Sequence, residues 1–535
     1  MSTILPSPSP LVGTSSRFER LPPESGLSLK AASRLFWIAM FIHVVVWTLL
    51  PGLLHFGYKP DVIEQLFIGR EWVLASSRHP ALPAILLELV NFVTGRAFLS
   101  PFLTSQLCAL VTVWGVWRLA RTVLTPISAL AASSSWMLYW YFTVESTKYN
   151  QNLPYIAFWT LTIVFVFESL RTNKTIYWIL AGIFIGLGLF SKFSMILLVV
   201  SILVYFVYDA KARQTWRNAG PWLSTLAATL VFIPILIWML LKQDLVMPEY
   251  LSNPDKTSII IHVWMPSWFL VEQIAIVSFT VIPLLFVLRL PLAKRTDLME
   301  EQGDCRRFLA AIILLPLLFH IAFGLLYLES MNLDYGAPLW PTLGVLILLT
   351  FRNRDGDSSN HHRDWRTLCR LGKALVVIEL TLIAIFVIQS CFSPYLMDRP
   401  RRFHFPMVAL GANCERIWAE HVDGPCPFVT GDWWLAGNAA EGMRPSPSVH
   451  AIGAFENMDL DDSPTIWSSD EDVNRQGGLI LWNPSFYPDE LPETLFERFP
   501  QAIILPALVI PYERFTNIPP VTIGVAIVKP KNPSQ

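Results

Sequence analysis

Eleven apolar stretches recur along the first three quarters of the chain, and most approach the ~20 residues needed to cross a bilayer. The 535 residues are 53% hydrophobic and only 15% charged, which excludes a disordered chain and is too apolar for an ordinary soluble enzyme. We therefore predict a mostly α, polytopic helical membrane protein with about 11 transmembrane helices, and up to 13. The predicted spans are Leu35–Leu54, Phe98–Leu119, Pro126–Val144, Leu153–Leu170, Ile176–Phe190, Ser194–Tyr208, Gly220–Leu241, Trp268–Leu288, Phe308–Leu328, Gly336–Phe351 and Ala374–Tyr395.

Lysine and arginine set the expected orientation. With the N-terminus inside, the inside segments hold roughly 22 Lys and Arg and the outside segments roughly 8. The N-terminus lacks a charged region followed by an apolar core and a cleavage site, so we expect no cleaved signal peptide. The predicted organisation is a disordered cytoplasmic tail (1–30), a transmembrane domain (31–395) and an extracytoplasmic domain (396–535).

The last 140 or so residues are polar and rich in proline, and short β-like runs alternate there with helix-compatible stretches. This alternation predicts a small α/β domain. Cys414 and Cys426 both fall in it, and an oxidising compartment permits a disulfide between them, although two unpaired thiols are the alternative. Their spacing is not a metal-binding pattern. The β-like runs are Phe428–Thr430, Val449–Ile452, Leu479–Trp482, Ile503–Leu505 and Val521–Val528.

The first outer loop, 55–97, contains a segment too polar to cross a bilayer. Pro60 is a good first residue for a helix. From there the apolar side chains Ile63, Leu66, Phe67, Val73 and Leu74 fall on one face, and Asp61, Glu64, Gln65 and Glu71 fall on the other. The pattern predicts a helix on the membrane surface with Asp61 and Glu64 one turn apart. The alternative is a connector whose carboxylates only stabilise a helix start. Ala81–Phe92 is too short to span and predicts a second surface or re-entrant helix.

Other polar residues collect at the outer ends of the predicted spans. Lys192 interrupts an otherwise apolar stretch from 176 to 208. Ionisable residues at membrane depth usually line a cavity or pathway, but a lysine can also extend to the headgroups. The net charge of -1 argues against a nucleic-acid partner. The other polar residues at this face are Arg78, His79, Glu145, Lys148, Tyr149, Asn150, Asn152, Glu329, Asn332, Asp334 and Tyr335.

Two classes of function fit a polar cavity on one side of a helical membrane protein. A transporter or flippase needs polar residues near the bilayer midplane and often shows internal repeats, and we find no repeat. A membrane enzyme that acts on a lipid-linked substrate from the outer side needs the one-sided arrangement, and it also accounts for the outer domain. A structural or receptor role does not explain the carboxylates and the lysine.

Several stretches resemble, in order and spacing, the bacterial family 39-type glycosyltransferases, which are related to protein O-mannosyltransferases and the lipid A aminoarabinose transferase. The family pattern in the first loop is an acidic pair, then GREW, then Lys-His-Pro-Pro-Leu, and residues 61–96 follow it. The departures are Arg78 for Lys, Ala81 for Pro, and Lys148 for the glutamate of Glu-Phe-Asn, which reverses the charge. The other similar stretches are TKYNQN (147–152), FSKFS (190–194), YGAPLWPTLG (335–344), GDWWLAGN (431–438) and GGLILWNP (477–484).

The resemblance implies the GT-C architecture, in which helices surround an outward-facing cavity. It implies transfer of a sugar from a polyprenyl phosphate to an extracytoplasmic acceptor, such as lipid A, lipopolysaccharide, another envelope glycan or a protein. The protein is then expected in a bacterial inner membrane, with its site facing the periplasm and with membrane lipids around it. No nucleotide-binding signature is evident, which agrees with a lipid-linked donor.

The resemblance points to Asp61 as the base that takes the acceptor proton, with Glu64 holding the acceptor or the sugar. Cations suit the departing phosphate, and the candidates are Lys192, Arg78, His79 and Lys148. The candidates for sugar or acceptor binding are Tyr149, Asn150 and Asn152, and the two asparagines could instead cap the following helix. We expect no cofactor, although two carboxylates leave a divalent metal open.

Overall fold

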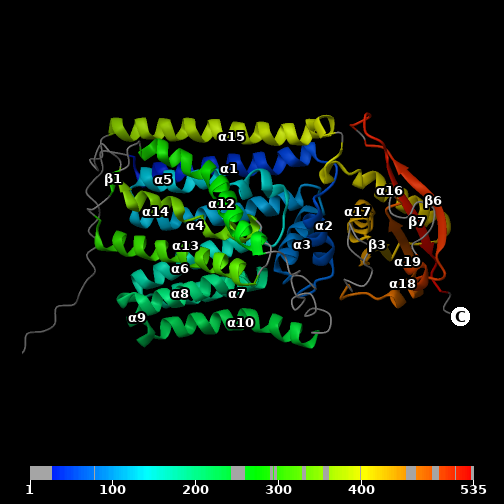
Figure 1. The fold of residues 1–535 in the computed structure, drawn as a ribbon, viewed down its shortest axis with the longest axis horizontal. Helices are drawn as coiled ribbons and strands as arrows, with labels where there is room; N and C mark the ends of the chain where they lie inside the picture. The colour runs from blue at the N-terminus through cyan, green and yellow to red at the C-terminus, as the bar shows by residue number, and fades with distance from the viewer. Residues whose placement is uncertain are drawn as a thin grey trace, which may run out of the picture.

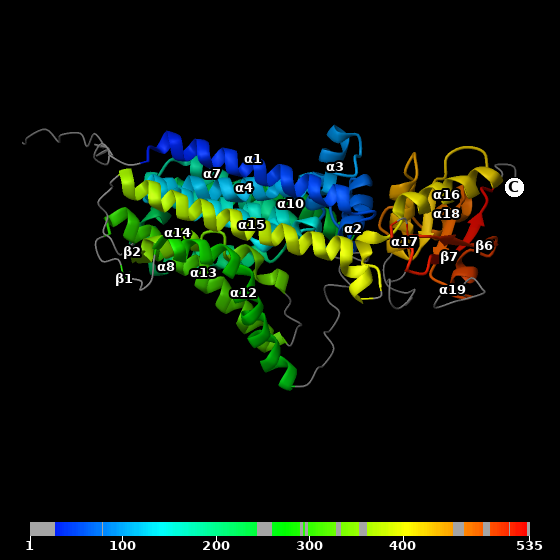
Figure 2. The same ribbon diagram turned by 90° about the horizontal axis from the view of Figure 1, so that it is seen from above.

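The computed structural model describes residues 27–76, 79–242, 259–288, 293–294, 298–327, 333–352, 361–397, 399–452, 465–484, 493–512 and 514–531. Long helices lie side by side in a bundle, and a smaller unit that contains a sheet lies against one end of it (Figures 1 and 2). We call this end, where α1 and α15 finish at Leu54 and Met397, the domain end. The opposite end is the far end.

The bundle confirms a mostly α, polytopic membrane protein. Seven helices among the described residues are long and apolar enough to cross a membrane, and a bent pair, α8 with α9 and the turn after it, would make eight. The eleven predicted spans are therefore not confirmed as a count. The bundle helices are α1 (Leu29–Leu54), α4 (Ser100–Val123), α5 (Pro126–Ser134), α6 (Asn152–Thr172), α7 (Thr175–Ser191), α8 (Met195–Tyr208), α9 (Ala210–Gln214), α10 (Ala219–Leu241), α12 (Ile259–Leu288), α13 (Glu300–Tyr327), α14 (Leu343–Thr350) and α15 (His361–Met397).

Two predicted spans are interrupted for local reasons. The span predicted over 126–144 ends as a regular helix at Ser134 and continues as short 3₁₀ turns, η1 (Ser135–Leu138), η2 (Trp140–Phe142) and η3 (Val144–Thr147). The hydroxyls of Ser134 and Ser135 donate to carbonyls four residues back, at 2.6 and 2.7 Å, a pattern that bends helices. The span predicted over 336–351 begins instead as the 3₁₀ segment η5 (Leu333–Leu339), which contains Pro338. Proline at a helix interior removes a hydrogen bond.

Helices α7 and α8 correspond to the short predicted spans at 176 and 194. At 17 and 14 residues they are shorter than a straight crossing requires. Helix α8 is followed by α9 at an angle of 91°, and the Asp209 carboxylate caps α9 by accepting from Lys211 N and Ala212 N, both at 3.0 Å. Gly182 of α7 has no room for a Cβ because the backbone of α10 lies directly against it.

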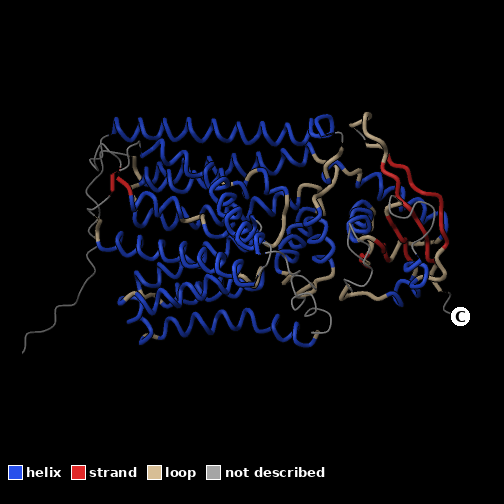
Figure 3. The backbone as a smooth tube through the Cα atoms, in the orientation of Figure 1, coloured by secondary structure: helices blue, strands red, loops and turns tan. Residues whose placement is uncertain are grey.

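The C-terminal unit contains the α/β pattern predicted from the sequence, with all five expected strands. The strand order is β4-β3-β5-β7-β6. Strand β3 pairs in parallel with β4 and β5, whereas β7 is antiparallel to both β5 and β6. Figure 3 shows these strands gathered in this unit, apart from the short pair β1 (Ala293–Lys294) and β2 (Phe351–Arg352) at the far end. The strands are β3 (Phe428–Gly431), β4 (Ser448–Ala451), β5 (Gly478–Trp482), β6 (Ile503–Ile510) and β7 (Val521–Val528).

Four helices and one 3₁₀ turn accompany this sheet. Helix α17 connects the parallel strands β3 and β4, and the buried carboxylate of Asp432 caps it by accepting from Trp434 N and Leu435 N, at 3.0 and 2.9 Å. Two parallel strands can be joined only by a crossover connection, and the helix within the GDWWLAGN stretch provides it. The helices are α16 (Met407–His421), α17 (Trp433–Gly442), α18 (Asp470–Gln476) and α19 (Glu493–Arg498), and the turn is η6 (Arg402–His404).

The C-terminal unit and the bundle are joined through the first loop, which carries α2 (Pro60–Arg70) and α3 (Leu82–Thr94). The carbonyl of Phe403 accepts from Phe56 N at 2.9 Å and from Gly57 N at 3.1 Å. The guanidinium of Arg70 forms an ion pair with Glu441 of α17 and donates to the Pro447 carbonyl at 2.7 Å. These contacts fix α2 between the two parts of the molecule.

Candidate functional site

Helix α2 positions Asp61. The helix begins at Pro60, as predicted, and its first turn carries Asp61, where the helix dipole favours a negative charge. It ends at Arg70, so Val73 and Leu74, predicted on its apolar face, lie beyond it. Gln65, predicted on the polar face, is buried.

The C-terminal unit covers the face of α2 that carries Ile63 and Phe67, and Gly69 packs against Ala84 of α3. Gly437 of α17 packs directly against Ile63 of α2 and has no room for a Cβ. The indole of Trp433 lies edge-on to Phe67, with ring centroids 6.5 Å apart. Helix α2 is therefore packed between the bundle and the C-terminal unit, and most of its residues are buried.

Three carboxylates from three elements surround Lys148. Its Nζ lies 3.5 Å from Asp61 Oδ2 in α2, 3.5 Å from Asp334 Oδ2 in η5 and 3.9 Å from Glu145 Oε1 in η3. Lys59 lies just before α2, and its Nζ is 3.5 Å from the other carboxylate oxygen of Glu145, Oε2. We call these five residues the charge cluster. They are partly exposed, with 20 to 30% of each side chain accessible, so a ligand can reach them.

The charge cluster shifts the pKa values of its own members. Burial is the main cause that raises the pKa of Asp61, and the charges of Asp334 and Glu145 raise it further against the opposing effect of Lys148 and Lys59. Burial lowers the pKa of Lys148, but Asp61, Asp334 and Glu145 outweigh it and hold that pKa above its usual value. Lys148 therefore stays charged, while Asp61 is a stronger base than an ordinary aspartate.

Lys192 lies beside the charge cluster. It ends α7 and donates from Nζ to Asn152 Oδ1 at 2.9 Å. Its ammonium lies 5.1 Å from the ring centroid of Tyr335 and 5.9 Å from that of Tyr155, a geometry for cation–π attraction. Tyr335 directly follows Asp334 of the charge cluster. The arrangement places a half-buried cation next to Asp334 and Lys148 of the charge cluster.

The remaining predicted site residues fall into three situations. Arg78 lies outside the described residues. His79 Nε2 contacts Gln151 Nε2 at 3.2 Å, so this histidine faces the loop that carries Lys148. Glu64 follows Asp61 by one turn on α2 and is half-buried, but it is not among the charges that shift the pKa of Asp61. The carboxylates that act on the pKa of Asp61 are those of Asp334 and Glu145.

The polar residues proposed for the sugar are more deeply placed than expected. Tyr149 is fully buried, and its hydroxyl donates to the Pro83 carbonyl at 2.7 Å, which is a structural contact. Asn150 Oδ1 accepts from the backbone N–H of Asn152 at 3.0 Å, the capping role left open above. Asn152 is buried, and its Nδ2 has no hydrogen-bond partner among the described residues, so it retains a donor for a ligand.

Sequence reasoning assigned no role to Asp334, Glu145 or Lys59. Asp334 and Glu145 belong to the polar residues at the outer ends of the predicted spans. They stand next to the YGAPLWPTLG and TKYNQN stretches, and this position in the sequence could have pointed to them. Lys59 carried no signal. Asp334 also accepts from the Tyr141 hydroxyl at 2.7 Å, which fixes the orientation of its carboxylate.

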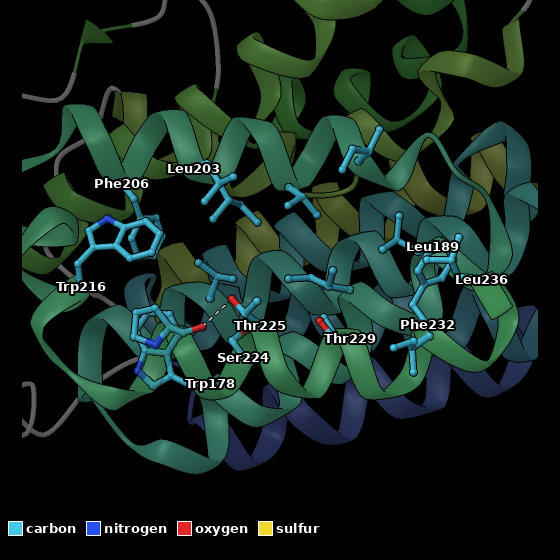
Figure 4. A pocket seen from close by; sticks show the side chains of 18 residues that line it. Trp178, Leu189, Leu203, Phe206, Trp216, Ser224, Thr225, Thr229, Phe232 and Leu236 are labelled. Atoms are coloured by element: carbon cyan, nitrogen blue, oxygen red, sulfur yellow. Dashed lines mark hydrogen bonds between the residues drawn. The ribbon is translucent and has the colours of Figure 1, made fainter.

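An apolar cavity of about 390 Å³ runs along α7, α8 and α10 (Figure 4). Trp178 and Trp216 lie at one end of it, and Leu189, Phe232 and Leu236 lie at the other. The chain neighbours of Lys192 reach the second end: Leu189 lines the cavity in the last turn of α7, and the ring of Phe193 lies 6.3 Å from that of Phe232. A long hydrocarbon chain suits such a surface.

Cys414 and Cys426 are both free and buried in the structure, so the predicted disulfide is absent from it. The Cys426 thiol instead donates to the Phe428 carbonyl at 3.2 Å. Burial raises the pKa of Cys426 to about 12 and that of Cys414 still further. Over the described residues, no group of three or more His, Cys, Asp or Glu is arranged to hold a metal ion.

Comparison with known proteins identifies the fold. The family described as dolichyl-phosphate-mannose-protein mannosyltransferase matches residues 78–238. The crystal structure of ArnT from Cupriavidus metallidurans bound to undecaprenyl phosphate is similar with a TM-score of 0.57 and 13% identity, over 94% of this chain and 100% of that one. Its apo state gives the same TM-score at 12% identity and the same coverage. Comparison with curated sequences gives no match. The chain has the GT-C fold, and the resemblance found in the sequence is confirmed.

Proposed function

We propose that this protein is a glycosyltransferase that moves a sugar from a polyprenyl phosphate to an acceptor at the domain end of the bundle. The observation that carries the proposal is a base candidate in the charge cluster with a half-buried cation, Lys192, beside that cluster. Asp61 has a raised pKa within the charge cluster, and Lys192 lies next to that cluster and three residues after Leu189, which lines an apolar cavity. Both lie in an ArnT-like fold.

The donor chemistry is supported by the cavity between α7, α8 and α10. Its apolar lining suits an isoprenoid chain, and Leu189, at one end of the cavity, precedes Lys192 by three residues in the chain. A lipid in this cavity would therefore bring its phosphate to the ammonium group. The similar ArnT structure was solved with undecaprenyl phosphate bound, which supports a donor of the same class here.

The proposed reaction is a displacement at the anomeric carbon. Asp61 takes the proton of the acceptor hydroxyl, whose oxygen bonds to the anomeric carbon as the bond from that carbon to the phosphate oxygen breaks. The polyprenyl phosphate leaves with the electron pair. Lys192 stabilises its charge, and Arg78 and His79 are proposed to assist. Lys148 neutralises the neighbouring carboxylates and keeps Asp61 in place.

Glu64 and Asn152 are the proposed contacts to the acceptor or the sugar. Asn152 has a buried amide donor without a partner among the described residues, and a sugar hydroxyl would satisfy it. The charge distribution of the chain supports a periplasmic position for this end, because lysine and arginine concentrate in the loops predicted at the far end.

The test is covalent transfer in proteoliposomes. Purified protein would be reconstituted with a polyprenyl phosphate that carries a radiolabelled sugar, and an envelope extract would be supplied as acceptor. Labelled product in the extract supports the proposal, whereas label moved across the bilayer without any product indicates a transporter. If a panel of sugars gives no labelled product and no movement of label across the bilayer, the proposed donor class is rejected.

A further inference from the structure

A histidine that the proposed mechanism does not use lies buried in the apolar part of α13. His320 is the only Asp, Glu, Lys, Arg or His between Phe308 and Leu328, and only 4% of it is exposed. It stands in the last third of the helix, which ends at Tyr327. Ionisable side chains at membrane depth are costly, and they usually line a site or a pathway. His320 therefore needs a partner or a role.

The hydrogen bond made by the imidazole shows where its proton lies. Nδ1 of His320 is 2.7 Å from the carbonyl oxygen of Pro316, which can only accept, so Nδ1 carries the hydrogen. Nε2 has no hydrogen-bond partner within the part of the chain that the structure describes. The ammonium of Lys192 acts on this ring electrostatically, and a neighbouring cation favours the neutral form. Nε2 is therefore a buried acceptor without a donor.

Tyr335 connects His320 with the site that contains Lys192. The ring centroids of His320 and Tyr335 are 6.2 Å apart, and the ammonium of Lys192 lies 5.1 Å from the centroid of Tyr335. The hydroxyl of Tyr139 donates to the carbonyl of Ala337 at 3.0 Å, which holds η5 in this place. His320 thus lies on the side of α13 that meets the proposed site for the donor phosphate.

A second buried group without a partner lies beside Lys192. The ammonium of Lys192 donates to Asn152 Oδ1 at 2.9 Å, and this contact fixes the orientation of the amide because an ammonium cannot accept. Asn152 Nδ2 is then a donor, and it too lacks a partner among the described residues. The site therefore holds an unpaired acceptor on α13 and an unpaired donor on α6. Buried polar groups left unpaired are destabilising, so a ligand that pairs both gains affinity.

Hydroxyl groups meet both requirements, because a hydroxyl donates one hydrogen bond and also accepts. A phosphate or carboxylate ion only accepts, so it can pair with Asn152 Nδ2 but not with His320 Nε2. A sugar ring carries several hydroxyls close together and offers donors and acceptors at once. The two unpaired groups therefore fit the sugar of a lipid-linked donor rather than its phosphate.

We propose that His320 and Asn152 bind hydroxyl groups of the sugar carried by the polyprenyl phosphate, with His320 Nε2 accepting and Asn152 Nδ2 donating. The inference rests on the proposed function, which it extends by requiring a free hydroxyl at one position of the donor sugar. Lys192 holds the phosphate beside them. His320 thereby determines donor specificity, because a sugar without this hydroxyl leaves Nε2 unpaired in the complex.

The test combines a deletion in the protein with a deletion in the donor. The full-length protein in proteoliposomes receives polyprenyl phosphates that carry mannose, glucose or galactose, and then each monodeoxy form of the sugar transferred fastest. The variant is His320→Phe, which keeps an aromatic ring beside Tyr335 but removes both nitrogens. The rescue variant is His320→Gln, because its amide oxygen can still accept a hydrogen bond. The matched control is His421→Phe, which breaks the same kind of Nδ1 contact, at 2.9 Å to Ile417 in α16.

For the parent protein, one monodeoxy donor should lose about 10-fold or more in kcat/KM relative to the complete sugar. His320→Phe should lose a similar factor with the complete sugar and lose nothing further with that monodeoxy donor. His320→Gln should keep most of the activity, and His421→Phe should behave like the parent. If the losses from the two deletions add for every monodeoxy donor, His320 does not contact the sugar and the inference is overturned.

A binding arm separates this inference from the proposed function. For at least one of the three sugars, the parent should bind the glycosylated lipid more tightly than bare polyprenyl phosphate. His320→Phe should lose this preference and bind the bare lipid with parent affinity. The preference without any transfer would reject the proposed function and leave a sugar site at His320. Transfer by the parent with the preference unchanged in His320→Phe would reject the inference alone, and neither transfer nor preference would reject both.

Discussion

The ammonium of Lys148 lies 3.5 Å from the carboxylate of Asp61 and the same distance from that of Asp334. One lysine thus joins α2 of the first loop to η5, far along the chain. The charge reversal at 148 relative to the family pattern put a carboxylate role at this position in doubt. The structure supplies a reason to retain a cation there, because three carboxylates would otherwise face one another at close range.

We predict that Lys148→Met shifts the pH dependence of transfer. Asp61 acts as a base only when it is deprotonated, so activity should rise with pH through the pKa of Asp61. The charge of Lys148 lowers this pKa, so removing it should shift the rise in activity to higher pH by about 1–3 pH units. The measurement is kcat/KM from pH 4 to 9. If the rise in kcat/KM stays at the same pH, or shifts to lower pH, a group other than Asp61 controls it.

We predict that Lys192→Met lowers kcat/KM for the lipid-linked donor by about 100-fold, since the leaving phosphate loses the cation proposed to stabilise it. Lys192→Arg should restore part of the activity because it keeps the charge. The matched control is Lys174→Met, which removes an exposed lysine at the other end of α7. Parent-like kinetics for Lys192→Met would reduce this residue to a structural anchor.

We predict that a bulky side chain placed in the apolar cavity weakens binding of donors with a long lipid chain but not of donors with a short one. Thr229 lines the cavity in α10, and Thr229→Trp should exclude about two methylene groups of the lipid. At ~0.8 kcal/mol each, the KM for a long polyprenyl donor should rise roughly 15-fold, whereas a donor with a ten-carbon chain should be unaffected. Leu230→Trp, at a neighbouring exposed position, is the control. Equal effects on both donors would place the lipid elsewhere.

We predict that reporters fused after residues 360 and 531 lie on opposite sides of the membrane, the first cytoplasmic and the second extracytoplasmic. The basis is the concentration of lysine and arginine in one set of loops. Alkaline phosphatase and fluorescent-protein fusions read the two compartments. The same reading at both positions would contradict the topology.

Hydrophobicity and turn residues were sufficient to predict much of the architecture. The long apolar segments, the start of α2 at Pro60 and all five strands of the C-terminal sheet follow from local patterns. The end of regular helix at Ser134 could not be predicted from these patterns, because it depends on serine hydroxyls that donate to backbone carbonyls within an apolar run. This interruption is one reason why the predicted spans outnumber the helices that meet the length criterion, and the short lengths of α7, α8 and α14 are another.

The candidate site was predictable only in part, because it is assembled from separate loops. Asp61 and Lys192 stood out as ionisable groups near apolar segments. Nothing local indicated that Asp334 would share Lys148 with Asp61. The burial of α2 likewise depends on its packing against α17 and α3, which hydrophobic periodicity within one helix cannot report.

The most direct test of the central claim is sugar transfer by Asp61→Asn. Asparagine keeps the size of the side chain and most of its hydrogen bonding but cannot accept the proton. Loss of a general base costs about 10²–10⁴-fold, so the variant should fold, bind the donor lipid with parent affinity and transfer sugar at least about 100-fold more slowly. Glu64→Gln, one turn away on the same helix, should change KM more than kcat. Transfer by Asp61→Asn at the parent rate would contradict the assignment of Asp61 as the base.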